Sequence, residues 1–282
     1  MKHIILLIIL VLYSAVIGQE RNNLFESLIA TEYAFSASAR DIGTHDAFLA
    51  YIAEDGILFR PNPVNGKDFL LDSGSSPGNL NWYPTYASIS KKGDLGFTTG
   101  PWEFSIKDND SNKSLYGNYC TVWERNTDGD WLFIIDFGNQ NEKPKILPAR
   151  LKSSLNYSAI PLKNLVNKKE DPTALFELDK QLKSDTYKKY LNSDSRLLLD
   201  GLLPVLGADN ISEYISRNKK FCCFIPTGGR ISISKDFGFT YGIYDNSDPK
   251  NNIKEQFNYL HIWKKEGKQW IILADISKKI TK

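Results

Sequence analysis

Two aspartates stand where a carboxylate can do proton chemistry. Asp136 and Asp275 each follow an apolar, strand-like run and lie at its C-terminal end. A carboxylate in apolar surroundings has a raised pKa and exchanges protons near neutral pH. Tyr119 or Tyr86 would then be the donor to an oxyanion. The alternative is structural: each aspartate accepts backbone N–H bonds or pairs with a basic residue, for example Arg60.

A cation and several aromatic residues of the same part of the chain suit ligand binding. Arg60 follows a short apolar strand, and a guanidinium fork matches a carboxylate or a phosphate. Trp82 and Trp102 lie beside proline and turn residues, and a buried indole N–H needs a partner. We predict that these residues and Tyr86 line the mouth of a binding site. The competing interpretation makes the aromatic residues core and Arg60 a surface or aspartate-paired residue.

The cysteines and histidines predict neither a disulfide framework nor a metal site. The chain has three cysteines and three histidines. Adjacent Cys222 and Cys223 are read as small buried apolar residues, with a redox pair or a metal site as the alternative. Zinc needs more ligands than His45 and His261 provide. No cofactor is expected, and no glycine-rich phosphate loop or Ser-His-Asp order can be picked out.

These candidate residues belong to a sequence that is repeated once. The block from Asp94 to Gly100 returns as Asp236 to Gly242, and the block from Trp131 to Asp136 returns as Trp270 to Asp275. Further blocks return in the same order at an offset of about 140 residues. This period far exceeds the roughly 20–50 residues of a solenoid repeat, so it indicates two tandem domains.

Each copy begins with a helical pattern and ends with strands. Apolar residues recur at helical spacing from Leu24 to about Ile42. The segments Ile89–Phe97, Gly117–Arg125 and Trp131–Phe137 are rich in aromatic and β-branched residues, as are their partners in the second copy. Turn sequences between the last runs predict a β-hairpin at the end of each copy. Helices followed by hairpins define the α+β class.

The two copies differ at the candidate binding positions. The second copy offers neither a cation nor an indole there, its aligned residues being Asp200, Gly201, Phe224 and Tyr244. We therefore predict that the first copy carries the binding or the chemistry. The second copy would be mainly a scaffold.

The N-terminus reads as a secretory signal. Lys2 precedes the apolar run Ile4–Leu12, which is too short to span a bilayer, and cleavage is expected before Gln19. The remaining charge is close to neutral and gives no attraction to nucleic acid or anionic lipid. The expected organisation is a signal peptide, a first domain, an ordered connector packed on a domain surface, and a second domain, at 1–18, 19–140, 141–172 and 173–282.

Four segments of the first copy carry a resemblance to a known superfamily. They are Asp55–Gly66, Gly93–Trp102, Tyr116–Trp123 and Gly129–Asp136. They resemble the nuclear-transport-factor-2-like superfamily, also called cystatin-like or polyketide-cyclase-like, and within it a bacterial branch of domains of unknown function. The resemblance implies two cone-shaped domains, each with N-terminal helices on a strongly curved antiparallel sheet and a pocket between them. That fold serves isomerases, cyclases, dehydratases and binding modules alike.

Three functions remain open at this point. The leading prediction is an exported periplasmic or extracellular protein that binds a small or amphipathic molecule, or a protein partner. The second is an acid/base enzyme with Asp136 as base and Tyr119 or Tyr86 as donor. The third is a structural pair in which the two copies dock as homodimers do. Self-association is possible, and no membrane contact is expected after cleavage.

Overall fold

The computed structural model describes residues 23–281 except 76, 109–110, 153–169, 219–220 and 249–252. The predicted signal peptide, its cleavage site and the middle of the predicted connector lie outside these residues. So do the side chains of Cys222 and Cys223. Within the described part of the chain, no helix is both long and apolar enough to cross a membrane.

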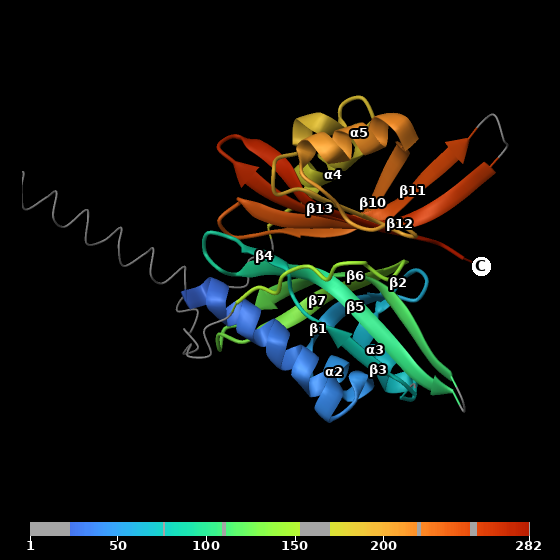
Figure 1. Ribbon diagram of the computed structural model, residues 1–282. Coiled ribbons are helices and arrows are strands. Elements are labelled where there is room, and N and C mark those ends of the chain that lie inside the picture. The colour runs from blue at the N-terminus through green and yellow to red at the C-terminus, as the bar shows by residue number, and fades with distance from the viewer. Residues whose placement is uncertain are drawn as a thin grey trace, which may run out of the picture.

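The protein folds as two α+β units (Figure 1). The first unit starts with a helix over residues 23–41. It continues through α2 Thr44–Tyr51, β1 Ile52–Phe59, β2 Pro63–Asn65, α3 Gly66–Asp72, β3 Asn79–Trp82, β4 Tyr86–Ile89, β5 Leu95–Asp108, β6 Ser111–Arg125 and β7 Trp131–Asn141.

The second unit repeats this plan with fewer strands. Its elements are α4 Thr173–Gln181, the 3-10 helix η1 Tyr187–Tyr190, β8 Arg196–Leu199, β9 Val205–Leu206, α5 Ala208–Asn218, β10 Phe221–Ile231, β11 Phe237–Asp248, β12 Ile253–Glu266 and β13 Gln269–Lys279.

Each unit is built on one curved sheet. The first has the strand order β2-β1-β7-β6-β5-β3, with β4 also paired to β5, and the second has the order β10-β11-β12-β13-β8-β9. Both are antiparallel except for one parallel pair, β1 with β7 and β8 with β13. The helices cover the outer face of each sheet, and the two inner faces meet (Figure 1). The predicted α+β class and tandem arrangement are confirmed.

The helix over 23–41 forms because its apolar residues recur on one face. Leu24, Leu28, Phe35 and Ala39 are all buried against the sheet. Gly43, with a φ of 93°, ends this helix and leads into α2. A positive φ suits glycine, because a side chain there would be strained.

The predicted strand from Ile89 to Phe97 is wrong, because a turn divides it into β4 and β5. The Ser90 hydroxyl accepts hydrogen bonds from the backbone N–H groups of Asp94 and Leu95, at 3.1 and 3.4 Å. Gly93 takes a φ of 64° in this turn. The apolar composition hid a local side-chain to backbone motif that competes with strand pairing.

The placement of Asp136 at the end of its strand is also wrong. Strand β7 continues to Asn141, so Asp136 lies at its middle, paired with Leu58 of β1 and Thr121 of β6. Asp275 likewise lies inside β13. Apolar character stops at Phe137, but backbone pairing does not.

The inner faces of the two sheets form a shared core. Its buried members in the first unit are Ala53, Phe59, Leu95, Phe97, Cys120, Val122, Ile134, Ile135 and Phe137, and those in the second unit are Leu198, Phe237, Phe239, Leu260, Ile262, Leu273, Ala274 and Ile276. Each sheet therefore covers the face on which the other could have met a protein partner.

The interface also repeats itself in polar contacts. The Asp94 carboxylate accepts a hydrogen bond from the backbone N–H of Ile233 at 2.8 Å, and Asp236 accepts one from that of Lys91 at 3.1 Å. These four residues are repeat partners in the sequence. The contact is therefore reciprocal, as in a two-fold symmetric dimer.

Candidate functional site

A cavity of about 270 Å³ opens between the helices and the sheet of the first unit. Its apolar wall consists mainly of aromatic side chains, with Phe35, Phe48, Leu80, Trp82, Trp102, Phe104 and Leu115. Its polar residues are Arg60, Tyr119, Asp136, Gln140 and Lys278, and Gly138 completes the lining. We call this hollow the first-unit cavity. Five of the six predicted site residues meet there, although the chain separates them widely.

Tyr119 lines this cavity and has an unused, buried hydroxyl. The side chain is only 5% exposed, and its hydroxyl has no hydrogen-bond partner among the described residues. Its neighbours on the adjoining strands are glycines, Gly100 on β5 and Gly138 on β7. Gly138 leaves space there, because a Cβ atom would be 3.6 Å from its nearest neighbour, whereas the Tyr83 backbone fills the space at Gly100. A buried hydroxyl without a partner costs free energy that a bound acceptor would recover.

Asp136 is a half-buried carboxyl of the same cavity. The Thr121 hydroxyl donates to its Oδ1 at 2.7 Å. Burial raises the pKa of Asp136 above its usual value, while the Thr121 hydrogen bond and the charge of Arg60 oppose that rise. Asp136 therefore binds a proton more tightly than an exposed aspartate.

The predicted pairing of Arg60 with Asp136 is not an ion pair here. Among the described residues, Arg60 forms no salt bridge within 4 Å, and its Nη1 donates to the Phe59 carbonyl at 2.9 Å. Its guanidinium lies 5.6 Å from the Phe69 ring centre. The guanidinium charge therefore faces the cavity mouth without a carboxylate in contact.

Glu32 is a functional candidate that the sequence analysis missed. It is fully buried and accepts hydrogen bonds from the indole N–H groups of Trp82 and Trp123, at 2.5 and 3.2 Å, and from the Thr98 hydroxyl. Burial raises the pKa of Glu32 to about 7, against the hydrogen bonds from Thr98 and Trp82. Its place on the core face, four residues after Leu28, was the available signal.

Trp102 is positioned by glycine. Its indole N–H donates to the backbone carbonyls of Asn118 and Asn139, at 3.2 and 3.1 Å. The ring crosses Gly117, its direct partner on β6. A Cβ atom at Gly117 would stand 1.9 Å from the Asn139 carbonyl oxygen and 2.5 Å from the ring. Only glycine permits this approach.

Tyr86 lies elsewhere. The structure places it on β4 against the shared core, with the Arg196 guanidinium of the second unit 3.5 Å from its ring centre. Burial raises its pKa to about 12. Tyr86 therefore does not line the first-unit cavity with the other predicted residues, because its strand faces the second unit.

The second unit fills the corresponding space with its own polar side chains. Tyr259, the repeat partner of Tyr119, donates its hydroxyl to Asp179 at 2.8 Å. The Nδ1 of His261 contacts Asp179 at 2.8 Å, and its Nε2 lies 3.5 Å from Asp275. The Tyr187 hydroxyl donates to Asp275 at 2.5 Å. Hydrogen bonds and close contacts between opposite charges link these groups in a buried network.

Charge explains why that network holds together. Burial alone lowers the pKa of His261, but the carboxylates of Asp275 and Asp179 raise it to about 9. His261 is therefore a buried cation between two acids near neutral pH. In the first unit, Thr121 takes the place of His261.

No group of three or more metal-ligating side chains occurs among the described residues. Cys120 is buried in the shared core and is not bonded to another cysteine.

The chain is similar in structure to several solved proteins. A DUF4783 family protein from Bacteroides uniformis matches with a TM-score of 0.31 and 15% identity, over 40% of this chain and 100% of that one. A ketosteroid isomerase-like protein from Erwinia carotovora atroseptica matches with a TM-score of 0.30 and 14% identity, over 39% and 88%. A SnoaL-like polyketide cyclase from Shewanella denitrificans matches with a TM-score of 0.27 and 17% identity, over 38% and 83%.

Each match covers about two fifths of this chain. No protein-family model matches the sequence. No curated protein matches it either.

Proposed function

We propose that the first-unit cavity binds a small amphipathic molecule, with an apolar ring as its body and an acceptor oxygen as its head. The observation that carries this proposal is the buried Tyr119 hydroxyl, which has no partner among the described residues and belongs to a residue that lines an aromatic cavity. Ligand sites combine apolar walls with a few polar anchors in this way.

The polar groups of the cavity favour an acceptor over a donor. Arg60 and Lys278 carry positive charge, and Tyr119 has a free hydroxyl hydrogen. Asp136, with its raised pKa, carries a negative charge less readily than an exposed aspartate does. A carboxylate or carbonyl oxygen of the ligand would meet mainly donors.

The second unit supports the assignment by contrast. The Tyr259 hydroxyl already donates to Asp179, so its hydrogen is not available to a ligand. Binding by the first unit thus fits the difference between the two copies.

Acid/base catalysis is the second candidate, and one observation favours it. A carboxyl with a raised pKa and a hydroxyl donor line the same cavity, as proton transfer next to a carbonyl requires. Asp136 would take the proton and Tyr119 would donate to the developing oxyanion. An Asp136→Asn variant that still binds ligand but loses turnover would support catalysis. Unchanged turnover would contradict it.

Calorimetric titration with 2-naphthoate tests the binding proposal. The wild-type protein should bind this anion more tightly than 2-naphthylmethylammonium, whose head is a cationic donor. Tyr119→Phe should weaken naphthoate binding by about 1 kcal/mol, the contribution of one hydrogen bond. Tyr190→Phe in the second unit is the control. Equal binding of the two probes, or an unchanged affinity in Tyr119→Phe, would refute the assignment.

Export belongs to the same proposal. The basic start at Lys2 and the apolar run Ile4–Leu12 support a cleaved signal, and thus a periplasmic or extracellular protein. N-terminal mapping of the exported protein should find a start at or near Gln19. A product retained in the cytosol at full length would contradict export.

A further inference from the structure

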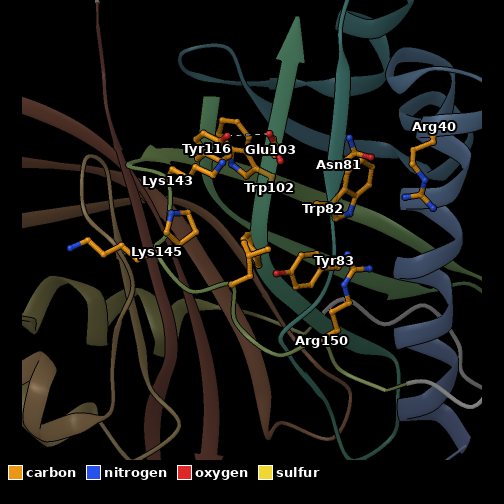
Figure 2. Close-up of a pocket in the computed structure, with 13 residues that line it drawn as sticks. Arg40, Asn81, Trp82, Tyr83, Trp102, Glu103, Tyr116, Lys143, Lys145 and Arg150 are labelled. Carbon is orange, nitrogen blue, oxygen red and sulfur yellow. Dashed lines mark hydrogen bonds between the residues drawn. The ribbon is translucent and has the colours of Figure 1, made fainter. Parts of the chain in front are cut away.

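A second hollow of about 620 Å³ lies on the first unit beside the cavity. Trp82 and Trp102 line both hollows. Figure 2 shows Arg40 and Arg150 on one side of this hollow, Lys143 and Lys145 on the other, and the aromatic residues between them. We call it the basic groove.

The cations of the basic groove are not neutralised by the protein. Arg40, Lys143, Lys145 and Arg150 line it, and Glu103 is its one acid. Among the described residues, none of the four forms a salt bridge within 4 Å. Four unpaired cations around one groove therefore attract an anion.

Residues 143–150, which supply three of these cations, are held against the first unit by hydrogen bonds and ring contacts. The Tyr33 hydroxyl donates to the Leu151 carbonyl at 2.6 Å, and the Leu151 N–H donates to the Pro84 carbonyl at 2.9 Å. The Arg150 guanidinium lies 4.1 Å from the ring centre of Tyr83. Lys143 lies 5.3 Å from that of Tyr116. The groove is thus preformed, which lowers the entropy cost of binding.

The aromatic floor offers mainly the partly exposed rings of Trp102 and Tyr116, because Trp82 and Tyr83 are buried, and it has few free polar atoms. The Trp82 indole N–H is held by Glu32, and that of Trp102 by two backbone carbonyls. The Tyr116 hydroxyl donates to Glu103 at 3.2 Å. A ligand there would stack on the rings and be oriented by charges at both ends.

We propose that the basic groove binds an acidic carbohydrate chain, in which carboxylate- or sulfate-bearing sugar rings are linked in a row. Sugar rings have C–H faces that pack on tryptophan, and their acidic groups would reach the cations on either side. This inference goes beyond the proposed function, because it concerns another site and another class of ligand. The two sites share a wall formed by Trp82 and Trp102.

The test uses tetragalacturonate and a heparin tetrasaccharide as probes in calorimetric titrations of the full chain. At least one should bind, and its affinity should fall as ionic strength rises. The neutral methyl ester of tetragalacturonate should bind at least about tenfold more weakly, as should tetraglutamate, which has the charge without the rings. Binding of neither acidic probe, or equal binding of tetraglutamate, would overturn the proposal.

Matched double variants locate the site. Lys143→Gln with Arg150→Gln should weaken probe binding by roughly tenfold. Lys265→Gln with Arg217→Gln removes the same charge from the second unit, where Lys265 also lies over an aromatic ring, and should leave affinity unchanged. Equal effects of the two pairs would overturn the proposal. Naphthoate binding by the groove variant reports separately on the first-unit cavity and should not change.

Discussion

Each unit contains a buried acidic residue, and the two acids bind different kinds of partner. Glu32 holds Trp82, the wall between the first-unit cavity and the basic groove, whereas Asp179 holds Tyr259 and His261 in a closed network. Both acids are fully buried and both accept from more than one donor. One donor to Glu32, Trp82, also lines the first-unit cavity and the basic groove, whereas the donors to Asp179 lie inside a buried network.

The ionisation of Glu32 should make stability depend on pH. Its pKa is about 7 in the folded protein and 4.5 as the reference, so the folded state binds this proton more tightly. The contribution of Glu32 to the free energy of unfolding is fully present below pH 4.5. It is lost as pH rises through about 7, and the loss is about 3 kcal/mol. Denaturant unfolding of wild type and Glu32→Gln should show this slope only in wild type. A Glu177→Gln control should keep it.

His261 should give a second slope at higher pH. Its folded pKa of about 9 exceeds the reference of 6.5, so its contribution is present below pH 6.5 and is lost as pH rises through about 9. His261→Thr, which copies the first unit, leaves two buried carboxylates without their cation and should cost about 3–5 kcal/mol at pH 6. Replacement of His45, which lies nearer the surface, is the control. A His261→Thr protein as stable as wild type would refute the buried cation.

At the scale of elements, the strands carry the site and glycines shape it. Gly117 admits the Trp102 ring, Gly100 admits the Tyr83 backbone, and Gly138 leaves space next to Tyr119. Trp102, Tyr119 and Gly138 of these strands line the first-unit cavity. Helix residues Phe35 and Phe48 close it from the other side.

Glycine substitutions test directly whether the close approach at Gly117 positions Trp102. Gly117→Ala should displace Trp102, destabilise the protein by roughly 1–3 kcal/mol and weaken naphthoate binding. Gly74→Ala is the control, because Gly74 lies outside the cavity lining and a Cβ atom there would meet no atom within 4 Å. Thermal unfolding and calorimetry measure both effects. Similar outcomes for the two variants would mean that Trp102 is not held by this close approach.

The elements that repeat in sequence were predictable, and those that depend on distant partners were not. Composition indicated strands β6 and β7 because their aromatic and β-branched residues face a core on both sides. The sequence also pointed to Trp102, because a buried indole N–H needs a partner, and to Asp136, because it is a carboxylate that follows an apolar run. It did not indicate Glu32, because its indole and hydroxyl partners lie 50 to 91 residues away.

The basic groove was hidden for a related reason. Its lysines and Arg150 stand in a segment that composition marks only as a connector. Their meeting with Arg40 and Trp102 depends on how that segment returns across the sheet. Tyr86 was misplaced because period-two alternation does not say which face of a sheet is inner and which is outer.

At the scale of the whole molecule, the second unit acts as an attached partner. Arg230 crosses the interface to Asp55 and Glu124, at 2.6 Å each, and the shared core buries the inner faces of both sheets. Lys278 of the second unit also reaches the rim of the first-unit cavity. The second unit therefore supports the fold and contributes a charge to the site.

Removal of the second unit should expose the inner face of the first sheet. A protein that ends at Lys152 would present the apolar residues Leu95, Phe97, Val122 and Phe137 to water. Because the natural contact is reciprocal, this face should pair with a second copy of itself or aggregate. Sedimentation analysis should find dimers or larger species. A stable monomer would show that the shared core is not needed to cover this face.

The central claim, that the first-unit cavity binds a small amphipathic molecule, is tested most directly by blocking the cavity. Leu115 is 48% exposed and lines it, so Leu115→Trp should fill the opening without disturbing the core. Leu71→Trp, at a position 66% exposed on α3 and outside the lining, is the control. Calorimetry should show that Leu115→Trp lowers the affinity for 2-naphthoate by at least about tenfold, or 1.4 kcal/mol, while Leu71→Trp binds as wild type does. Equal affinity of both variants and wild type would contradict the claim.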